Sequence, residues 1–412
     1  MKYKTGVFIW IPFLLAVTSA HFKSIWLVLA TAILIFIMVA ILPFAHKREN
    51  LWLFILCAVC SIPINVFLLN EYPQWRYLMF NGENGVLNIF SMIEMTLIYT
   101  SVEEIVKIIG IDTFMFGMSP LIKRLKNNDI FDIRELDVKE FSSSNVMEMY
   151  TIDYVFHMAS IASPTYYRKH PLETIDSNVW GIRELLDCFS KRSIKGFLFY
   201  SSSEVYGDPD SQMVPSSETY WGNVSCVGPR ACYDESKRFG ETLCWVYYRM
   251  FNMPIRIVRL FNVFGPGLKL NDRRAPADFA ESVFFDKDIV IYSNGQPKRT
   301  FCYVADSAIG EIKALLSEEF NVFNIGSNSN EMTILELAEL FVDVGREILG
   351  YNGNVRYEVS EDKDYLTHDP QRRCPDISKA EALLNYQPTI CPREGIYRYL
   401  KYLKEEGSEA SW

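Results

Sequence analysis

The sequence predicts an α/β protein: a doubly wound parallel sheet followed by a smaller C-terminal lobe and preceded by an α-helical membrane region. From residue 75 onward, runs rich in β-branched and aromatic residues alternate with helical patterns, which is typical of parallel strands joined by helices. The run at 196–201 has the composition of a strand buried on both faces. Before residue 71 the chain is almost free of charge, which is typical of membrane spans.

The expected elements follow one another in the order of a doubly wound sheet. Strands are expected at 75–81, 106–112, 130–136, 153–158, 196–201 and 255–261, with helices at 85–104 and 233–251. We divide the body, residues 71–412, at residue 265. Residues 71–265 are expected mainly to bind a cofactor and residues 266–412 mainly to bind a substrate.

The first 70 residues differ in charge from the rest of the chain. They hold five basic residues and one acid, a net charge of +4, which leaves −13 on residues 71–412 out of −9 for the whole chain. Three uncharged runs lie in this region, at 5–20, 24–45 and 50–70. At about 1.5 Å per helical residue the second and third match a bilayer core, and the first is marginal. We expect two or three transmembrane helices in contact with lipid.

The number of spans decides which side of the membrane the body occupies. Three spans with the basic ends inside would place it outside the cytoplasm, and two would return it to the side of the N-terminus. We favour a cytoplasmic body, because the cysteines show no disulfide pattern; a lumenal body is the alternative. An acidic body also argues against nucleic-acid binding, which needs a basic surface.

Nine cysteines and five histidines are scattered along the 412 residues without the spacing of metal ligands. Cys57 and Cys60 form a Cys-x-x-Cys pair inside an apolar run. Nothing there stabilises a thiolate, so both are expected to be small core residues. The sequence predicts neither a disulfide framework nor a metal site.

A glycine pair follows the first expected strand, where a phosphate-binding turn would lie. Gly82 and Gly85 permit a tight turn and close approach of the backbone to a pyrophosphate. Asn88 stands where a third glycine is usual and is a poor substitute for it. Asp112 ends the second strand, where an acid can hydrogen-bond an adenosine ribose and favours NAD over NADP. Together these residues predict a bound NAD.

Tyr233 and Lys237 form a Tyr-x-x-x-Lys pair at the start of an expected helix, one turn apart on one face. A phenol is a poor base at neutral pH, but a neighbouring ammonium favours the phenolate and can hold a nicotinamide ribose. The serines 201–203 end a strand upstream, at the sheet edge where ligands bind in this architecture. The pair and the serines therefore belong to one expected site.

Six stretches of the body together resemble the extended short-chain dehydrogenase/reductase family, and within it the UDP-glucuronate decarboxylases, also called UDP-xylose synthases. They are HMASIASP (157–164), SSSEVYGDP (201–209), WGNVSCVGPRACYDESKR (221–238), RLFNVFGP (259–266), NGQPKRTFCYVAD (294–306) and HDPQRRCPDISKA (368–380). They extend over most of the body in the order of the family. The resemblance implies a Rossmann-like fold, tightly held NAD and a UDP-sugar substrate.

The resemblance also implies roles for individual residues. Tyr233 resembles the base for the hydroxyl at carbon 4 of the sugar, with Lys237 as its partner. Ser202 keeps the hydroxyl of a usual threonine, while Ser203, Glu204 and Arg299 match positions that serve the sugar carboxylate. A solvated turn is the alternative for Glu204, and a purely structural pairing is the alternative for Arg299. The expected cofactor-binding residues are Gly82, Gly85, Asp112, Asp137, Ala159, Tyr233 and Lys237, and the expected substrate-binding residues are Glu204, Asn262, Arg274, Arg299 and Arg373.

The implied reaction is NAD-dependent decarboxylation of UDP-glucuronate to UDP-xylose. Oxidation at carbon 4 makes a β-keto acid, from which carbon dioxide leaves because the ketone accepts the electrons. A 4-epimerase or 4,6-dehydratase acting on another nucleotide sugar is one alternative, and a degenerate membrane-tethered binding protein is another. Asn88, in the glycine turn, and Gly267, where the family has arginine, depart from the pattern and bear on cofactor and substrate affinity.

The helix expected at 233–251 presents Phe239, Leu243, Tyr247 and Met250 at helical spacing. This is more apolar surface than one sheet contact requires. Because the family commonly pairs such helices, we expect a homodimer; the alternative is that these side chains belong to the core.

Overall fold

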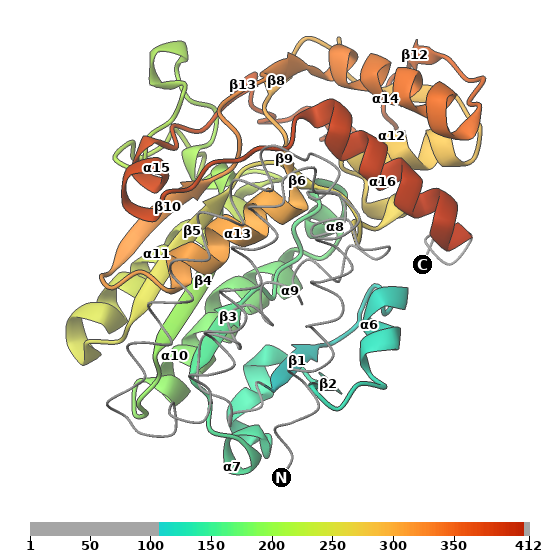
Figure 1. The fold of residues 1–412 in the computed structure, drawn as a ribbon. Helices are drawn as coiled ribbons and strands as arrows, with labels where there is room; N and C mark the ends of the chain where they lie inside the picture. Colours follow the sequence, from blue (N-terminus) through green and yellow to red (C-terminus); the bar gives the residue numbers. More distant parts are fainter. Residues whose placement is uncertain (1–106, 408–412) are drawn as a thin grey trace, which may run out of the picture. The chain divides into compact units, whose positions relative to one another are not determined.

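The computed structural model describes residues 107–407, which belong to the second of two compact units, Ser101–Trp412 (Figure 1). The strand expected at 75–81, the helix expected at 85–104 and the expected membrane spans lie outside the described residues. None of the helices between residues 107 and 407 is long and apolar enough to cross a membrane.

Parallel strands form the centre of this unit. A two-stranded sheet pairs β1 with β2, and a four-stranded sheet has the order β10-β5-β4-β3. The strands are β1 (Ile108–Asp112), β2 (Phe131–Glu135), β3 (Tyr154–His157), β4 (Gly196–Ser202), β5 (Ile255–Leu260) and β10 (Asn321–Ile325). All these pairings are parallel, which confirms the Rossmann-like α/β class that the alternation of strands and helices predicts.

Strand β4 has apolar cores on both of its faces. Phe197 and Phe199 pack with residues of α10 (Ile182–Phe189) and α11 (Ala231–Phe251). Leu198 and Tyr200 point the other way and pack with residues of α13 (Val304–Leu315) and α15 (Ser378–Leu384), so α11 and α13 flank the strand (Figure 1). Side chains alternate between the faces of a strand, so a strand covered on both faces is apolar at almost every position.

Short helices connect the strands of the first half. They are α6 (Pro120–Leu125), α7 (Val146–Met149), α8 (Pro164–Lys169) and α9 (Pro171–Ile175), with the 3₁₀-helical η2 (Val138–Ser143), η4 (Ser203–Tyr206) and η5 (Ser211–Met213) and the π-helical η3 (Asp176–Gly181). Helix α11 is the longest helix between residues 107 and 407, and it approaches β4 closely at Gly240. A Cβ atom at Gly240 would come within 2.4 Å of Phe199 Cζ. This close packing holds the first turns of α11 beside the end of β4.

A second lobe gathers α12 (Ala275–Phe284), α14 (Ile334–Leu349) and α16 (Pro392–Glu406) around a core of its own (Figure 1). Short elements complete it: η6 (Leu270–Asp272), β6 (Val263–Phe264), β7 (Ile289–Ile291), β8 (Lys298–Arg299), β9 (Cys302–Tyr303), β11 (Met332–Thr333), β12 (Val355–Tyr357) and β13 (Arg372–Arg373). The chain beyond residue 265 also returns to the main sheet through α13 and β10. The domain boundary at 265 therefore stays a prediction.

Candidate active site

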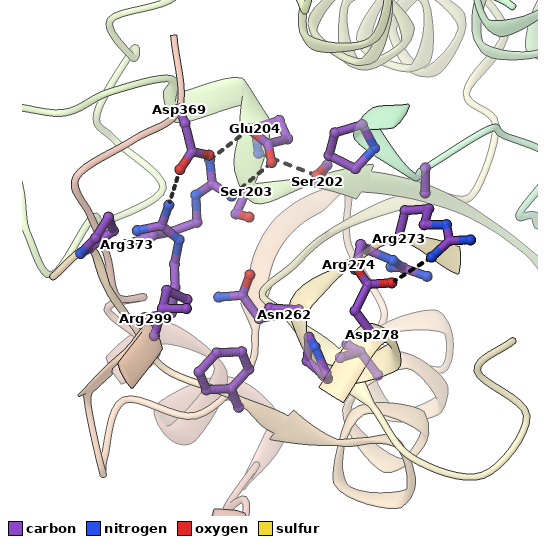
Figure 2. A pocket seen from close by; sticks show the side chains of 18 of the residues that line it. Ser202, Ser203, Glu204, Asn262, Arg273, Arg274, Asp278, Arg299, Asp369 and Arg373 are labelled. Carbon is purple, nitrogen blue, oxygen red and sulfur yellow. Dashed lines mark hydrogen bonds and ion pairs between the residues drawn. The ribbon is translucent and has the colours of Figure 1, made fainter. Parts of the chain in front are cut away.

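A cavity of about 330 Å³ opens at the carboxyl ends of β3, β4 and β5, where ligands bind in doubly wound sheets. Its walls come from both lobes, and Figure 2 shows part of it. Among the residues that line it are Ser160 after β3, Ser201, Ser202, Ser203 and Glu204 at the end of β4, Arg230, Tyr233 and Lys237 from α11 and its start, Asn262 after β5, and Arg274, Arg299, Asp369 and Arg373 from the second lobe.

Tyr233 and Lys237 are both buried in this cavity wall, one turn apart on α11. The Lys237 ammonium donates a hydrogen bond of 2.7 Å to the carbonyl oxygen of Tyr200 and lies 5.7 Å from the centre of the Tyr233 ring. The Tyr233 ring stacks on the ring of Tyr167, with 5.1 Å between centroids and 12° between planes. Stacking and helix packing thus hold the phenol at the end of β4.

The ligand-free protein does not favour the phenolate of Tyr233. Burial raises the pKa of Tyr233 to about 12, although a hydrogen bond with Ser202 opposes the rise. Burial also lowers the pKa of Lys237 to about 7. A positive charge bound beside the phenol would lower its pKa, and the oxidised nicotinamide ring of NAD carries such a charge. The two pKa shifts therefore fit a site that is completed by a cationic cofactor.

Glu204 lies at the centre of an arginine cluster (Figure 2). Its carboxylate accepts hydrogen bonds of 2.7 and 2.6 Å from Arg373 and one of 2.6 Å from Arg230. Burial by itself would raise the pKa of Glu204, but the guanidinium groups of Arg230 and Arg373 outweigh it and hold the pKa at about 2. Its side chain is only 13% exposed. Glu204 is therefore a largely enclosed, ionised group, and the alternative of a solvated turn residue is wrong.

Arg299 and Asp369 extend this cluster. Strands β8 and β13 pair in parallel and place Arg299 opposite Arg373. Arg299 Nη2 donates to Asp369 Oδ2 at 3.3 Å and to the Pro370 carbonyl oxygen at 2.5 Å. The other carboxylate oxygen of Asp369 lies 3.6 Å from Arg230 Nη1. Asp369 thus joins Arg299 to Arg230, and through Arg230 to Glu204.

The cluster carries a surplus of positive charge. Three guanidinium groups, each at most 8% exposed, face the two carboxylates of Glu204 and Asp369. A third acid, Asp234, lies 3.8 Å from Arg230 Nε, and burial raises its pKa to about 8, so with Asp234 protonated at neutral pH the net charge is +1. The Nε atom of Arg373 is buried and has no hydrogen-bond partner among the described residues, whereas Arg230 Nε lies 3.8 Å from Asp234 Oδ2. Because buried charges need partners, this end of the cavity is suited to an anionic group of a ligand.

The opposite end of the cavity carries charges of both signs. Arg274 pairs with Asp272, with 3.1 Å between Nη2 and Oδ2, and Arg273 Nη1 lies 3.8 Å from Asp278 Oδ1. Between the two ends, Asn262 Nδ2 donates to the Thr300 carbonyl oxygen at 2.8 Å. The structure thus brings the predicted residues Asn262, Arg274 and Arg373 to one cavity. Gly267 has a φ of +92°, in the left-handed region that favours glycine.

The predicted adenosine-side residues lie at three strand ends: β1 and β2 pair in one sheet, and β3 is the edge strand of another. Asp112 ends β1 and accepts a hydrogen bond of 2.6 Å from Phe114 N. Asp137 follows β2 and accepts one of 2.9 Å from Lys139 N. Ala159 follows β3, and Ser160 next to it has a buried hydroxyl without a partner in the described part of the chain. Asp112, Asp137 and Ala159 are not part of the cavity lining, so their role in cofactor binding stays a prediction. Gly82 and Gly85 lie outside the described residues.

Sequence reasoning missed three charged residues of the site, namely Arg230, Asp234 and Asp369. Arg230 and Asp234 flank Tyr233 in the stretch Pro-Arg-Ala-Cys-Tyr-Asp. Their position beside the Tyr-x-x-x-Lys pair could therefore have identified them as site residues. Burial raises the pKa of Asp234 to about 8, and the nearby charge of Glu204 adds to this effect. Within residues 107–407 no three His, Cys, Asp or Glu side chains come together as metal ligands.

The fold and the site define a class of protein. A parallel doubly wound sheet with serines at the end of one strand and a Tyr-x-x-x-Lys pair facing them from a long helix is the arrangement of short-chain dehydrogenase/reductase proteins. Residues 106–326 match the NAD dependent epimerase/dehydratase family, and the chain belongs to this family. The match begins after Gly82 and Gly85, so neither glycine is part of it.

Known relatives agree with this assignment. The chain is 37% identical over 292 residues to UDP-glucuronic acid decarboxylase 1 of Arabidopsis thaliana, covering 71% of this chain and 63% of the relative. It is 34% identical to UDP-glucuronic acid decarboxylase 1 of Xenopus tropicalis, covering 72% and 66%. The chain therefore spans somewhat less than two thirds of the length of these two relatives.

Solved structures show the same fold. UDP-glucuronic acid 4-epimerase of Bacillus cereus, in complex with UDP-glucuronic acid and NAD, is 27% identical, with a TM-score of 0.59 and coverage of 73% of this chain and 91% of the epimerase. UDP-glucose 4-epimerase of Thermotoga maritima, with UDP-glucose, is 23% identical, with a TM-score of 0.64 and coverage of 76% and 94%. The latter likeness concerns the fold alone.

Proposed function

We propose that this protein decarboxylates UDP-glucuronate to UDP-xylose through a 4-keto sugar, with NAD as its cofactor. The observation that carries the proposal is the buried arginine cluster around Glu204, which has a net charge of +1 with Asp234 protonated and lies in the same cavity as Tyr233. A glucuronate carries its carboxylate directly on carbon 5, and the neighbouring carbon 4 bears the hydroxyl that is oxidised. A sugar with carbon 4 at Tyr233 would therefore present its anionic end to a part of the cavity in which arginines outnumber the carboxylates of Glu204 and Asp369.

Tyr233, Lys237 and Ser202 serve the oxidation at carbon 4, the first step of the proposed reaction. Bound NAD supplies the hydride acceptor, and later the hydride donor, at carbon 4, and Tyr233 and Lys237 would hold its nicotinamide ribose. Tyr233 takes the proton of the carbon 4 hydroxyl, assisted by the hydrogen bond with Ser202. Once carbon 4 is a ketone, the bond to the carboxylate breaks and its electrons move toward the ketone oxygen. A proton from water in the cavity must then be added at carbon 5 before the ketone is reduced.

Glu204 is not the donor of that proton at neutral pH, because the arginines hold its pKa at about 2. We assign it instead to the orientation of the arginines at the carboxylate end. Arg299, opposite Arg373 on the neighbouring strand, supplies a planar fork of donors that suits a carboxylate. Ser203 is buried beside Glu204 and completes the proposed carboxylate end.

Incubation of the full-length protein with NAD and UDP-glucuronate, followed by mass analysis, tests the proposal. The expected product is smaller than the substrate by one carbon dioxide, and UDP-glucose serves as a control that cannot lose carbon dioxide. A product of unchanged mass with inverted configuration at carbon 4 would support a 4-epimerase instead, a reading that the likeness to the B. cereus enzyme favours. Tight binding without any product would support a binding protein that has lost turnover.

We also propose that residues 1–70 anchor the protein in a membrane with its body in the cytoplasm. The support is the sequence alone: three uncharged runs next to a body whose cysteines form no disulfide pattern. In intact cells, the body should resist added protease and become sensitive on lysis. Digestion without lysis would contradict a cytoplasmic body.

A homodimer is the proposed assembly, with the exposed side of α11 as its interface. Phe239 and Met250 are 49% and 68% exposed, whereas Leu243 and Tyr247 are buried in the core. Two of the four side chains that suggested the interface are therefore core residues. The adjacent α9 and η3 add Leu172 and Trp180, which are 72% and 59% exposed, so a self-association surface has support beyond the two residues of α11.

A further inference from the structure

Arg230 joins two parts of the site, the start of the helix that carries Tyr233 and the arginine cluster. Its carbonyl oxygen accepts hydrogen bonds of 3.0 Å from the backbone amides of Tyr233 and Asp234, so it begins the helix that carries Tyr233. Its guanidinium donates 2.6 Å to Glu204 and lies 3.6 Å from Asp369. The base and the arginine cluster therefore share one anchor.

The surroundings of Arg230 hold its guanidinium in place. The side chain is 4% exposed, and the ring of Tyr167 lies 5.9 Å from its central carbon. The same ring stacks on Tyr233 at 5.1 Å. Tyr167 thus contacts both Tyr233 and the guanidinium of Arg230. A displacement of Arg230 would therefore disturb the position of Tyr233 as well as that of the arginine cluster.

We propose that Arg230 is a positioning residue for the reaction: it holds Glu204 and Asp369 so that Arg299 and Arg373 face the carboxylate end of the substrate while Tyr233 faces carbon 4. This inference rests on the proposed function and deepens it. Arg230 acts through Glu204 and Asp369, so its loss should lower kcat more than it raises KM. A misplacement of about 1 Å in such an arrangement costs on the order of 10²-fold in rate.

The charges around Glu204 predict how the loss of Arg230 changes the pH dependence. Groups that act electrostatically on Glu204 or on its partners come from several segments: Tyr167, Arg230, Tyr233, Asp234, Arg299, Asp369 and Arg373. Of these, Arg230 and Arg373 are the cations that hydrogen-bond the carboxylate. Burial and the nearby Asp234 both raise the pKa of Glu204. Without Arg230, only the guanidinium of Arg373 would still hydrogen-bond the carboxylate and oppose that rise, so Glu204 would take up a proton at a higher pH.

The experiment compares Arg230→Met, Arg230→Lys and Arg256→Met in the full-length protein. Arg256 is a matched control, because as a whole residue it is 4% exposed, against 3% for Arg230. It donates to the backbone carbonyls of Pro254 and Ser317 and is not part of the cavity lining. We expect Arg230→Met to lower kcat for carbon dioxide release about 10²-fold and to lose activity below a pH at which the parent is still active. Arg230→Lys should restore the acid range but only part of kcat, because one ammonium cannot span both carboxylates.

If Arg230→Met keeps the pH profile of the parent and loses no more kcat than Arg256→Met, the positioning role is wrong. Failure of the proposed function is a separate result, visible as a parent that releases no carbon dioxide. In that case titration of the ¹³C-labelled Glu204 carboxyl, assigned with Glu204→Gln, decides the inference. A Glu204 pKa that rises in Arg230→Met and not in Arg256→Met supports it, and an unchanged pKa overturns it.

Discussion

Both terminal nitrogens of Arg373 donate to the carboxylate of Glu204, at 2.7 and 2.6 Å. Glu204 follows the end of β4 and Arg373 lies on β13 of the second lobe, so this bidentate pair ties the two walls of the cavity together. Such pairs are geometrically selective as well as strong. The pair also explains why a carboxylate is tolerated at this depth: with Arg230 it is the negative centre of a positive cluster.

Replacement of the phenol should stop the reaction at its first step. Tyr233→Phe removes the group that takes the proton from carbon 4, so carbon dioxide release should fall about 10²-fold or more. The ring still stacks on Tyr167, so NAD binding and folding should persist. Tyr386→Phe is a suitable control, because Tyr386 is fully buried and its hydroxyl contacts Gly326 O at 3.2 Å outside the cavity. A Tyr233→Phe protein with parental turnover would remove Tyr233 from the mechanism.

Loss of the carboxylate-binding residues should affect decarboxylation more than cofactor binding. We expect Arg299→Ala and Glu204→Ala to lower carbon dioxide release about 10²-fold, while the affinity for NAD stays near that of the parent. Lys298→Ala is the matched control for Arg299, because Lys298 precedes it on β8 and is exposed. Parallel assays of carbon dioxide release and NAD binding separate the two effects.

Parental carbon dioxide release by Arg299→Ala would remove the main chemical support for a decarboxylase. The structural reading of Arg299, as a residue that only pairs with Asp369 and the Pro370 carbonyl, would then hold. The 4-epimerase would become the better assignment.

Much of the fold was predictable because its strands and helices have strong local patterns. The run at 196–201 is apolar on both faces since β4 is covered by α11 on one side and α13 on the other. The four-residue spacing of Tyr233 and Lys237 places both on one face of any helix. Strand ends of a parallel sheet meet at one edge, which is why Ser202 and the Tyr-x-x-x-Lys pair could be assigned to one site.

The arginine cluster was only partly predictable, because it depends on tertiary contacts. Asp369 reaches Arg230 and Arg299 from distant positions in the sequence, and no local pattern marks it. The strands β8 and β13 have two residues each, too few to show the alternation that predicts a strand. The set of exposed apolar side chains on α11 was predicted only in part, since Leu243 and Tyr247 are buried in the core.

The acid at the end of β1 should select the cofactor. Asp112 would repel the 2′-phosphate of NADP, so direct titration should show tighter binding of NAD than of NADP. Asp112→Asn should reduce that preference by up to about fivefold, in line with the loss of one exposed charge interaction. Tighter binding of NADP by the parent would contradict both the role of Asp112 and the choice of cofactor.

The exposed side of α11 should control assembly. Phe239→Asp and Met250→Asp put a charge on side chains that are about half or more exposed, so a monomer should tolerate them while an apolar interface should not. Light scattering of full-length protein in detergent should show a dimer for the parent and a smaller mass for both variants. Glu339→Lys, an exposed change on α14 of the second lobe, is the control. A monomeric parent at micromolar concentration would disprove the dimer.

Burial of Lys237 should make stability depend on pH in the alkaline range. Burial lowers the pKa of Lys237 from 10.5 to about 7, whereas the unfolded chain keeps the ordinary value. Between these two pH values the unfolded chain holds a proton that the folded protein has released. The free energy of unfolding attributable to Lys237 should therefore rise with pH across this window, with a slope of at most about 1.4 kcal/mol per pH unit.

Denaturant unfolding of the cofactor-free, full-length protein from pH 6 to pH 10 measures this effect, taken as the difference between the parent and Lys237→Met. The methionine variant should be the more stable of the two near neutral pH, because it carries no buried ammonium, and its advantage should shrink as the pH rises. Lys298→Met, on an exposed lysine, should show no such trend. A difference between parent and Lys237→Met that stays constant with pH would mean that Lys237 titrates alike in the folded and unfolded states. The lysine would then be fully protonated at neutral pH in the free protein, and the phenol of Tyr233 would have a cationic neighbour even before the cofactor binds.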